Sequence, residues 1–182
     1  MIDNMNLNSS VVLDPTLVLS KKEWEHYLNP KKSNNKKKYL LLFLIYNEDN
    51  NATKYAREIA DEKGLEVVQL NWKPVKKDGV DKIVLYKTPF EFLKYIRDAD
   101  FIVTNSFHGT AFAINFNKEF VTVARKEFNT RLENILEDFN LKHRYVEKEF
   151  KISKLKETIN YDEVNNILDE KRLESNYFYL HH

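Results

Sequence analysis

The sequence has 182 residues, of which 42% are hydrophobic and 31% charged, and this suits one soluble domain with a full core and extended tails. Its 29 lysines and arginines nearly balance 28 aspartates and glutamates, so the formal charge of +1 creates no global field that would attract nucleic acid. The absence of cysteine excludes disulfides, thiolate catalysis and cysteine-ligated metals.

The sequence contains no membrane-spanning segment and no glycine-rich nucleotide-binding motif. The longest apolar or aromatic run, residues 39–46, is far too short to span a bilayer, and no secretory signal pattern opens the chain. Neither a GxGxxG nor a Walker motif is present. We therefore expect a cytoplasmic protein, and the lysine-rich stretch 30–38 leaves open a peripheral contact with the inner face of the cell membrane.

Residues 1–38 are expected to form an N-terminal extension and linker. The pattern around residues 14–16, Asp-Pro-Thr, predicts an extended piece followed by a turn. Residues 20–23, Ser-Lys-Lys-Glu, match a capping box and predict a short helix. The stretch 30–38, PKKSNNKKK, is typical of a solvated linker.

Strand and helix patterns alternate from residue 39 onward, so we expect residues 39–182 to form one α/β domain. The predicted strands are residues 39–46, 66–70, 82–86, 101–104 and 119–124, with a short extended piece at 143–146. The predicted helices are residues 52–63, 89–97, 107–116 and 130–139, with a last one opening at 160–163. Thr88 and Thr130 match capping boxes. This alternation predicts a doubly wound parallel sheet with right-handed crossovers.

The junction between the 101–104 strand and the 107–116 helix is the strongest candidate site. Ser106 is a good N-cap, which places His108 and Gly109 in the first helical turn. Ligands of parallel sheets bind beyond the carboxyl ends of strands, and free N–H groups at a helix start attract anions. A histidine there is a titratable donor beside an anion site. The alternative is a structural histidine beside a glycine that is needed for packing.

Other polar residues follow the predicted strands and should reach the same edge of the sheet. Arg125 follows the 119–124 strand and Arg131 opens the next helix, and an arginine can bind phosphate or carboxylate through two hydrogen bonds. The alternative for both is a solvated surface pair. The full set of candidate ligand-binding residues is Asn47, Asn105, Ser106, Gly109, Thr110, Arg125, Asn129 and Arg131.

The remaining histidines and aspartates do not indicate a second catalytic or metal-binding site. His26 and His143 are isolated in the sequence, and no close His/Asp spacing suggests a metal site. Asp98 and Asp100 could pair for acid–base chemistry, but they precede a strand and belong at the opposite edge of the sheet.

Four segments of the chain resemble the polysaccharide pyruvyl transferase family and follow one another as they do there. In chain order they are VLDPTLVL at 12–19, FIVTNSFHGTAFAINFNKEFVTVAR at 101–125, NTRLENILEDFNLKHR at 129–144 and INYDEVNNILDEKRLESNYF at 159–178. In that family VLDPTLVL-like residues open the second Rossmann-like domain, so the resemblance implies the C-terminal half of a two-domain, GT-B-like enzyme. We therefore expect that this chain lacks the N-terminal half, which would help to hold the acceptor, and that the fragment is inactive alone.

The resemblance also implies a reaction and its residues. The family moves a pyruvyl group from phosphoenolpyruvate, its donor substrate, to two hydroxyls of a glycan or lipid-linked saccharide, without a cofactor. His108 matches the family histidine thought to act as general acid, and the helix start at 106–109 would receive phosphate or carboxylate. Many members have arginine where this chain has Ser106, and Arg125 or Arg131 could substitute for it.

Two other readings stay open. One is a GT-B glycosyltransferase half that binds a sugar nucleotide, which predicts a carboxylate placed to hold the ribose hydroxyls. The other is a non-catalytic isolated domain that binds a partner through its exposed interdomain face. In either case, the uncovered face of such a half could form a homodimer.

Overall fold

The protein is built on a parallel sheet of six strands, which the computed structural model shows within the described residues 12–28, 37–45, 51–86 and 88–181. The strands are β1 Tyr39–Phe43, β2 Glu66–Asn71, β3 Lys82–Leu85, β4 Phe101–Thr104, β5 Phe120–Val123 and β6 Tyr145–Val146. Their order is β3-β2-β1-β4-β5-β6, and every neighbouring pair is parallel. The predicted doubly wound, Rossmann-like α/β fold is confirmed.

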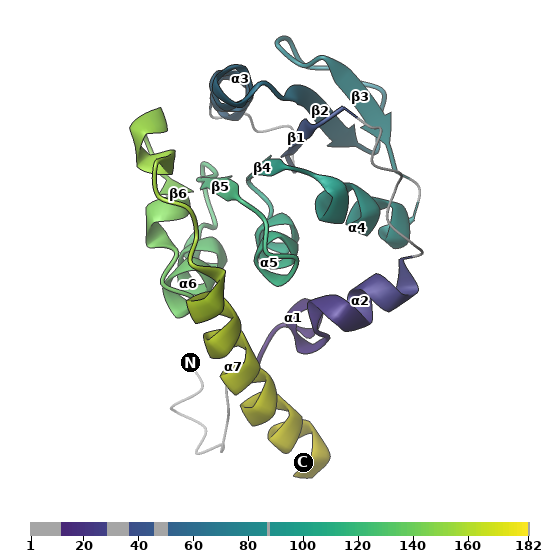
Figure 1. Ribbon diagram of the computed structural model, residues 1–182, viewed down its shortest axis with the longest axis vertical. Coiled ribbons are helices and arrows are strands. Elements are labelled where there is room, and N and C mark those ends of the chain that lie inside the picture. Colours follow the sequence, from purple (N-terminus) through teal and green to yellow (C-terminus); the bar gives the residue numbers. More distant parts are fainter. Residues whose placement is uncertain (1–11, 29–36, 46–50, 87, 182) are drawn as a thin grey trace.

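Helices cover both faces of the sheet (Figure 1). The helices are α1 Pro15–Val18, α2 Lys21–Tyr27, α3 Ala52–Lys63, α4 Pro89–Asp98, α5 Phe107–Asn115, α6 Thr130–Asp138 and α7 Tyr161–His181, with 3₁₀ turns η2 Lys142–Arg144 and η3 Ile152–Leu155. The apolar face of α3 forms one core with the sheet, around Ile59 and Val103. Side chains of α4, α5, α6 and α7 form the second core on the opposite face.

Helix α3 shows how closely local chemistry fixes an element. Its predicted bounds, 52–63, are the observed ones, and Gly64 follows with φ of 63° and donates its N–H to carbonyls of the last turn. A left-handed residue at this position is the usual way to end a helix, and glycine adopts it without a Cβ penalty. Thr88 likewise caps α4 through a complete capping box with Glu91, as predicted.

Two predicted details were wrong, and the bounds of a third were too wide. Residues 15–18 form the one-turn helix α1 instead of an extended piece, because Pro15 suits a first helical position and the Asp14 carboxylate accepts from the N–H of Thr16. Thr130 does not cap α6 but is its first residue, since Asn129 precedes it as N-cap. The 143–146 piece is extended only at Tyr145–Val146.

The first strand ends at Phe43, earlier than predicted, because a side chain replaces the next strand as hydrogen-bond partner. Asn105 accepts from the N–H of Ile45 at 2.8 Å and donates to its carbonyl at 3.4 Å. The sheet runs from β1 to β2 and β3 in one direction and from β4 to β5 and β6 in the other. Asn105 therefore joins the β1 and β4 loops at the topological switch point, where ligands of such sheets bind.

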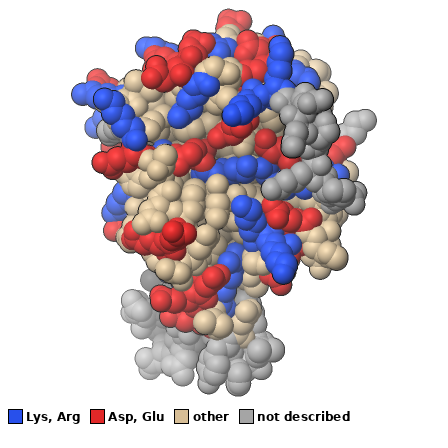
Figure 2. All heavy atoms as spheres, viewed as in Figure 1, with Lys and Arg blue, Asp and Glu red and all other residues tan. Residues whose placement is uncertain are grey.

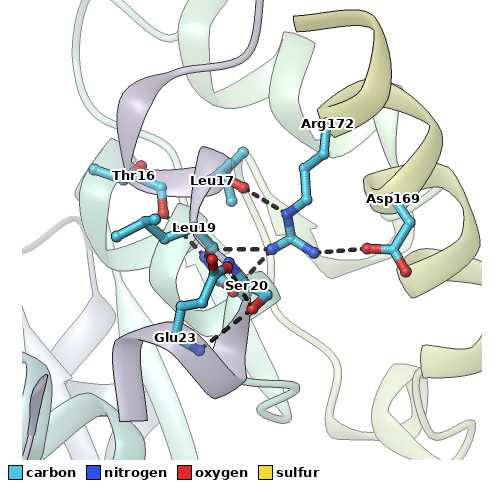
Figure 3. A network of polar contacts seen from close by, with 8 residues as sticks. Thr16, Leu17, Leu19, Ser20, Glu23, Asp169 and Arg172 are labelled. Carbon is cyan, nitrogen blue, oxygen red and sulfur yellow. Dashed lines mark hydrogen bonds and ion pairs between the residues drawn. The ribbon is translucent and has the colours of Figure 1, made fainter. Parts of the chain in front are cut away.

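Residues 12–28 of the predicted extension pack on the α/β domain (Figure 3). Leu17 and Leu28 are buried in the second core. Arg172 on α7 donates to the carbonyls of Leu17 at 2.9 Å and Leu19 at 3.1 Å and pairs with Asp169 at 2.8 Å. This network fastens the turn after α1 to α7 and thereby sets the position of the neighbouring Asp14.

Candidate anion-binding site

A cavity of about 880 Å³ lies at the carboxyl edge of the sheet. It spans the switch point, because its lining comes from the ends of β1 to β5 and from the start of α4, α5 and α6. The lining residues are Phe43, Leu44, Ile45, Trp72, Tyr86, Thr88, Pro89, Phe92, Ser106, Phe107, His108, Phe112, Arg125 and Arg131. Of the predicted site residues, the structure thus brings together Ser106, His108, Arg125 and Arg131.

The start of α5 forms one wall of this cavity and is arranged as predicted. Ser106 is the N-cap, and its hydroxyl accepts from the N–H of Gly109 at 3.3 Å. The first N–H groups of a helix lack partners inside it, so those of Phe107 and His108 are left for solvent or an anion. The His108 side chain is exposed, and its ring stands edge-on to that of Phe107, with centroids 5.6 Å apart.

Gly109 is a packing glycine. A Cβ at this position would lie 2.5 Å from Thr104 Oγ1 and 3.2 Å from a ring carbon of Phe43. The Thr104 hydroxyl is fixed there, because it donates to the Phe43 carbonyl at 2.7 Å and accepts from the N–H of Ser106 at 3.1 Å. Only glycine lets α5 begin this close to β1 and β4.

Arg131 is held over the cavity by two contacts. Its guanidinium carbon lies 3.9 Å from the ring centroid of Phe107, and its Nη2 lies 3.1 Å from a carboxylate oxygen of Asp14. Its side chain is 65% exposed, so the guanidinium stays accessible to a ligand. The Asp14 contact also shows how the N-terminal segment takes part in the site.

Arg125 lies in a loop that hydrogen bonds hold in a strained shape. The Asn129 side chain accepts from the N–H of Arg125 and donates to its carbonyl, both at 2.8 Å. Arg125 in turn donates from its guanidinium to the carbonyl of Phe128. The backbone of Phe128 is in the left-handed region, with φ of 61°. A bulky residue rarely adopts this conformation unless its surroundings enforce it. Asn129 therefore fixes the loop that presents Arg125.

The remaining predicted residues do not line the cavity. Asn105 is buried and bridges the two loops described above. Thr110 is fully buried, where its hydroxyl contacts the Ser106 carbonyl at 3.0 Å and the Thr122 hydroxyl at 2.9 Å. Asn47 lies outside the described residues.

The aromatic half of the cavity is not among the predicted site residues. Phe43, Phe92 and Phe112 read as core positions in their elements, and their spacing gives no sign of a ligand. Trp72 and Tyr86 come directly after β2 and β3, and this position was the available signal. Burial raises the pKa of the Tyr86 phenol, so its hydroxyl stays protonated.

The cavity has a cationic bias. Among the described lining residues there are two arginines and a histidine but no carboxylate. The rest of the surface shows no such bias on the face in Figure 2, where basic and acidic side chains are interspersed. In the described part of the chain, no group of His, Asp or Glu side chains could hold a metal ion. The cationic lining suits a small anion.

The sequence matches the family model described as polysaccharide pyruvyl transferase over residues 1–127 of the 182. The chain belongs to the polysaccharide pyruvyl transferase family. The resemblance noted from the sequence is thereby confirmed, and the matched part contains Ser106, His108 and Arg125. No curated protein matches the sequence.

Solved structures with the same fold are GT-B enzymes and epimerases. The Methanocaldococcus jannaschii UDP-GlcNAc 2-epimerase, with UDP-GlcNAc and UDP, has a TM-score of 0.55 and 16% identity, over 94% of this chain and 51% of its own. The S. aureus MnaA–UDP structure has a TM-score of 0.54 and 17% identity, over 96% and 49%. The kitacinnamycin glycotransferase has a TM-score of 0.52 and 11% identity, over 81% and 42%. This family member therefore spans about half the length of these chains.

No helix in the described residues of this pyruvyl transferase family member is long and apolar enough to cross a membrane.

Proposed function

We propose that this chain is the donor-binding half of a pyruvyl transferase that moves a pyruvyl group from phosphoenolpyruvate to a sugar of a cell-surface polysaccharide. The observation that carries the proposal is the cavity at the switch point, which combines the α5 start, His108 and two arginines. Phosphoenolpyruvate is a small polyanion, and helix N–H groups and guanidinium groups are its natural partners.

Each end of the donor has a suitable partner in this proposal. The start of α5 would receive one anionic group through the N–H groups of Phe107 and His108. Arg131, whose planar group is held by Phe107 and Asp14, would bind the other through two hydrogen bonds. Arg131 and Arg125 would then supply the positive charge that many family members place where this chain has Ser106.

His108 would serve as the general acid. In the overall reaction two sugar hydroxyls add to the enol carbon of the donor, the C–O bond to phosphate breaks and phosphate leaves. One hydroxyl proton ends on the methylene carbon, which becomes a methyl group, and the other leaves with phosphate. An exposed imidazole at the cavity wall can pass one of these protons and recharge from solvent.

A sugar nucleotide is the competing donor. It would call for a carboxylate to hold the ribose hydroxyls, and the described cavity lining contains none. The observation favours phosphoenolpyruvate, and ligand-induced thermal stabilisation of the chain tests it. A ligand at a hundredfold excess over its Kd stabilises a protein by about 2.7 kcal/mol. We expect this with phosphoenolpyruvate and not with UDP-GlcNAc, and the reverse result would establish the glycosyltransferase alternative.

The role of His108 needs a turnover assay. In the full-length enzyme, with lipid-linked saccharides from the host cell as acceptor, His108→Ala should abolish phosphate release from phosphoenolpyruvate. His26→Ala is the matched control, because His26 is also exposed but lies outside the cavity lining. Equal turnover in the two variants would remove His108 from the reaction.

A further inference from the structure

We propose that the aromatic half of the cavity binds the ring of the acceptor sugar, with Trp72 and Tyr86 as its stacking and hydrogen-bonding residues. This proposal deepens the proposed function and rests on it for the identity of the neighbouring donor. It assigns part of acceptor binding to this half of the enzyme.

Size is the first reason. A cavity of about 880 Å³ suits a ligand much larger than a three-carbon acid phosphate. The cationic residues occupy the side formed by α5, α6 and the loop after β5, which leaves the side formed by β1, β3 and α4. A second molecule fits there, and a transferase must hold its acceptor next to its donor.

The second reason is that the aromatic rings form one continuous wall. The centroids of Phe43 and Phe92 are 4.9 Å apart, those of Tyr86 and Phe92 are 5.7 Å apart, and those of Phe92 and Phe112 are 6.2 Å apart. Phe112 lies on α5, the helix that begins at Ser106 and carries His108. The wall thus ends on the helix that holds the proposed acid, which brings a stacked sugar ring toward the reacting carbon.

Trp72 is the residue whose position a purely structural role does not explain. Its side chain is 68% exposed although it lines the cavity, and exposed tryptophan leaves a large apolar face in water. The Lys73 ammonium lies 4.3 Å from its ring centroid and covers one face by a cation–π contact. The opposite face can stack on the C–H face of a sugar.

Hydroxyl groups of the sugar need polar partners, and the wall supplies them. In the described part of the structure no hydrogen bond engages the Tyr86 hydroxyl, and a phenol is a protonated donor at neutral pH. Thr88 adds a second hydroxyl at the rim. This combination of apolar faces with isolated hydroxyls suits a saccharide.

The test uses the two tryptophans of the chain. Trp24 packs edge-on against Phe112 and donates to the Thr16 carbonyl, so Trp24→Phe leaves Trp72 as the single fluorescent reporter. We would titrate this variant with the methyl glycosides of glucose, galactose, mannose and N-acetylglucosamine. The expected result is a saturable change of Trp72 emission with at least one of them. No change with any of the four, or a change with UMP instead, would overturn the proposal.

Variants then locate the site by saturation-transfer NMR with the glycoside that binds. Trp72→Ala should raise its Kd by about tenfold or more, and Tyr86→Phe, which keeps the ring, by severalfold. Tyr27→Ala is the control, since Tyr27 is 59% exposed on α2 outside the cavity lining. Unchanged affinity in Trp72→Ala would overturn the assignment.

Phosphoenolpyruvate binding, measured separately by thermal stabilisation, distinguishes the two proposals. Sugar binding without phosphoenolpyruvate binding would defeat the proposed donor and leave the sugar site standing. Phosphoenolpyruvate binding without sugar binding would defeat the sugar site alone.

Discussion

At the amino edge of the sheet, charged side chains pair with each other and with backbone groups, whereas at the carboxyl edge His108, Arg125 and Arg131 line an open cavity. Arg144 and Glu119 represent the first edge. The Arg144 side chain is fully buried, and its Nη2 lies 3.0 Å from a Glu119 oxygen, while the other Glu119 oxygen accepts from the N–H of Ile159. Asp100 likewise accepts from the N–H of Tyr39 at 3.0 Å.

The difference teaches which charges serve the fold and which remain for a ligand. A buried charge is tolerated only with a partner, so the amino edge uses its charges to fasten β5 to η2 and to the segment before α7. Arg131 also has a partner, Asp14, but its side chain stays 65% exposed. The residues at the carboxyl edge can therefore change partners when an anion enters.

Removing the Glu119–Arg144 ion pair at the amino edge should have the largest effect on stability. Glu119→Gln leaves the Arg144 guanidinium buried without its counter-charge, which we expect to lower the free energy of unfolding by about 3 kcal/mol or more. Urea denaturation measures the loss. Glu137→Gln is the control, because the Glu137–Lys142 pair is exposed on both sides and should contribute less than about 1 kcal/mol. Similar losses in both variants would contradict this view of the edge.

Gly109→Ala should disturb the base of the cavity by overpacking. The new Cβ would lie 2.5 Å from Thr104 Oγ1, and such crowding costs about 1–3 kcal/mol of unfolding free energy. Combining it with Thr104→Ala, which removes that oxygen, should cost less than the sum of the two single changes. Strict additivity in this double-mutant cycle would show that the clash lies elsewhere.

Removing a cation from the carboxyl edge should change binding and leave stability nearly intact. Arg131→Met deletes charge-assisted hydrogen bonds of about 1.5–3 kcal/mol, which corresponds to a rise of about 10- to 100-fold in the Kd for phosphoenolpyruvate. Calorimetric titration measures the change. Lys54→Met removes the same charge from an exposed position on α3 and should leave this Kd unchanged. An equal rise of the Kd in both variants would indicate that the overall charge of the protein attracts phosphoenolpyruvate, without a defined binding site.

The smallest expected effect is a pH dependence at the amino edge. Burial and the neighbouring Arg144 lower the pKa of His143, so the unfolded chain binds the proton more readily than the folded one. Stability should therefore fall as the pH drops below about 6.5, the ordinary histidine pKa. Because His143 is only partly buried and solvent screens its charge, we expect less than about 0.5 kcal/mol. His143→Gln should flatten the profile between pH 7 and 5, whereas His26→Gln should not.

The part of the site at the start of α5 could be predicted, because it depends on residues that are neighbours in the sequence. Ser106 as cap, His108 in the first turn and the 101–104 strand all follow from neighbouring residues, and the structure has them at these positions. Predictions failed where a side chain chose a distant or unexpected partner. Asn129 holds the backbone of Arg125, and Asn105 holds that of Ile45, so neither faces the cavity.

The sequence by itself determined the alternation of strands and helices, most of the helix ends and the family, because periodicity, capping and motifs depend on residues close together in the chain. Only the tertiary structure decided which strand ends meet. The strand order placed Trp72 and Tyr86 in the same cavity as His108, and the packing of α1 brought Asp14 to Arg131, 117 positions away. The physical reason is that such contacts depend on the register of the sheet and the path of its crossovers, which no short stretch of sequence encodes.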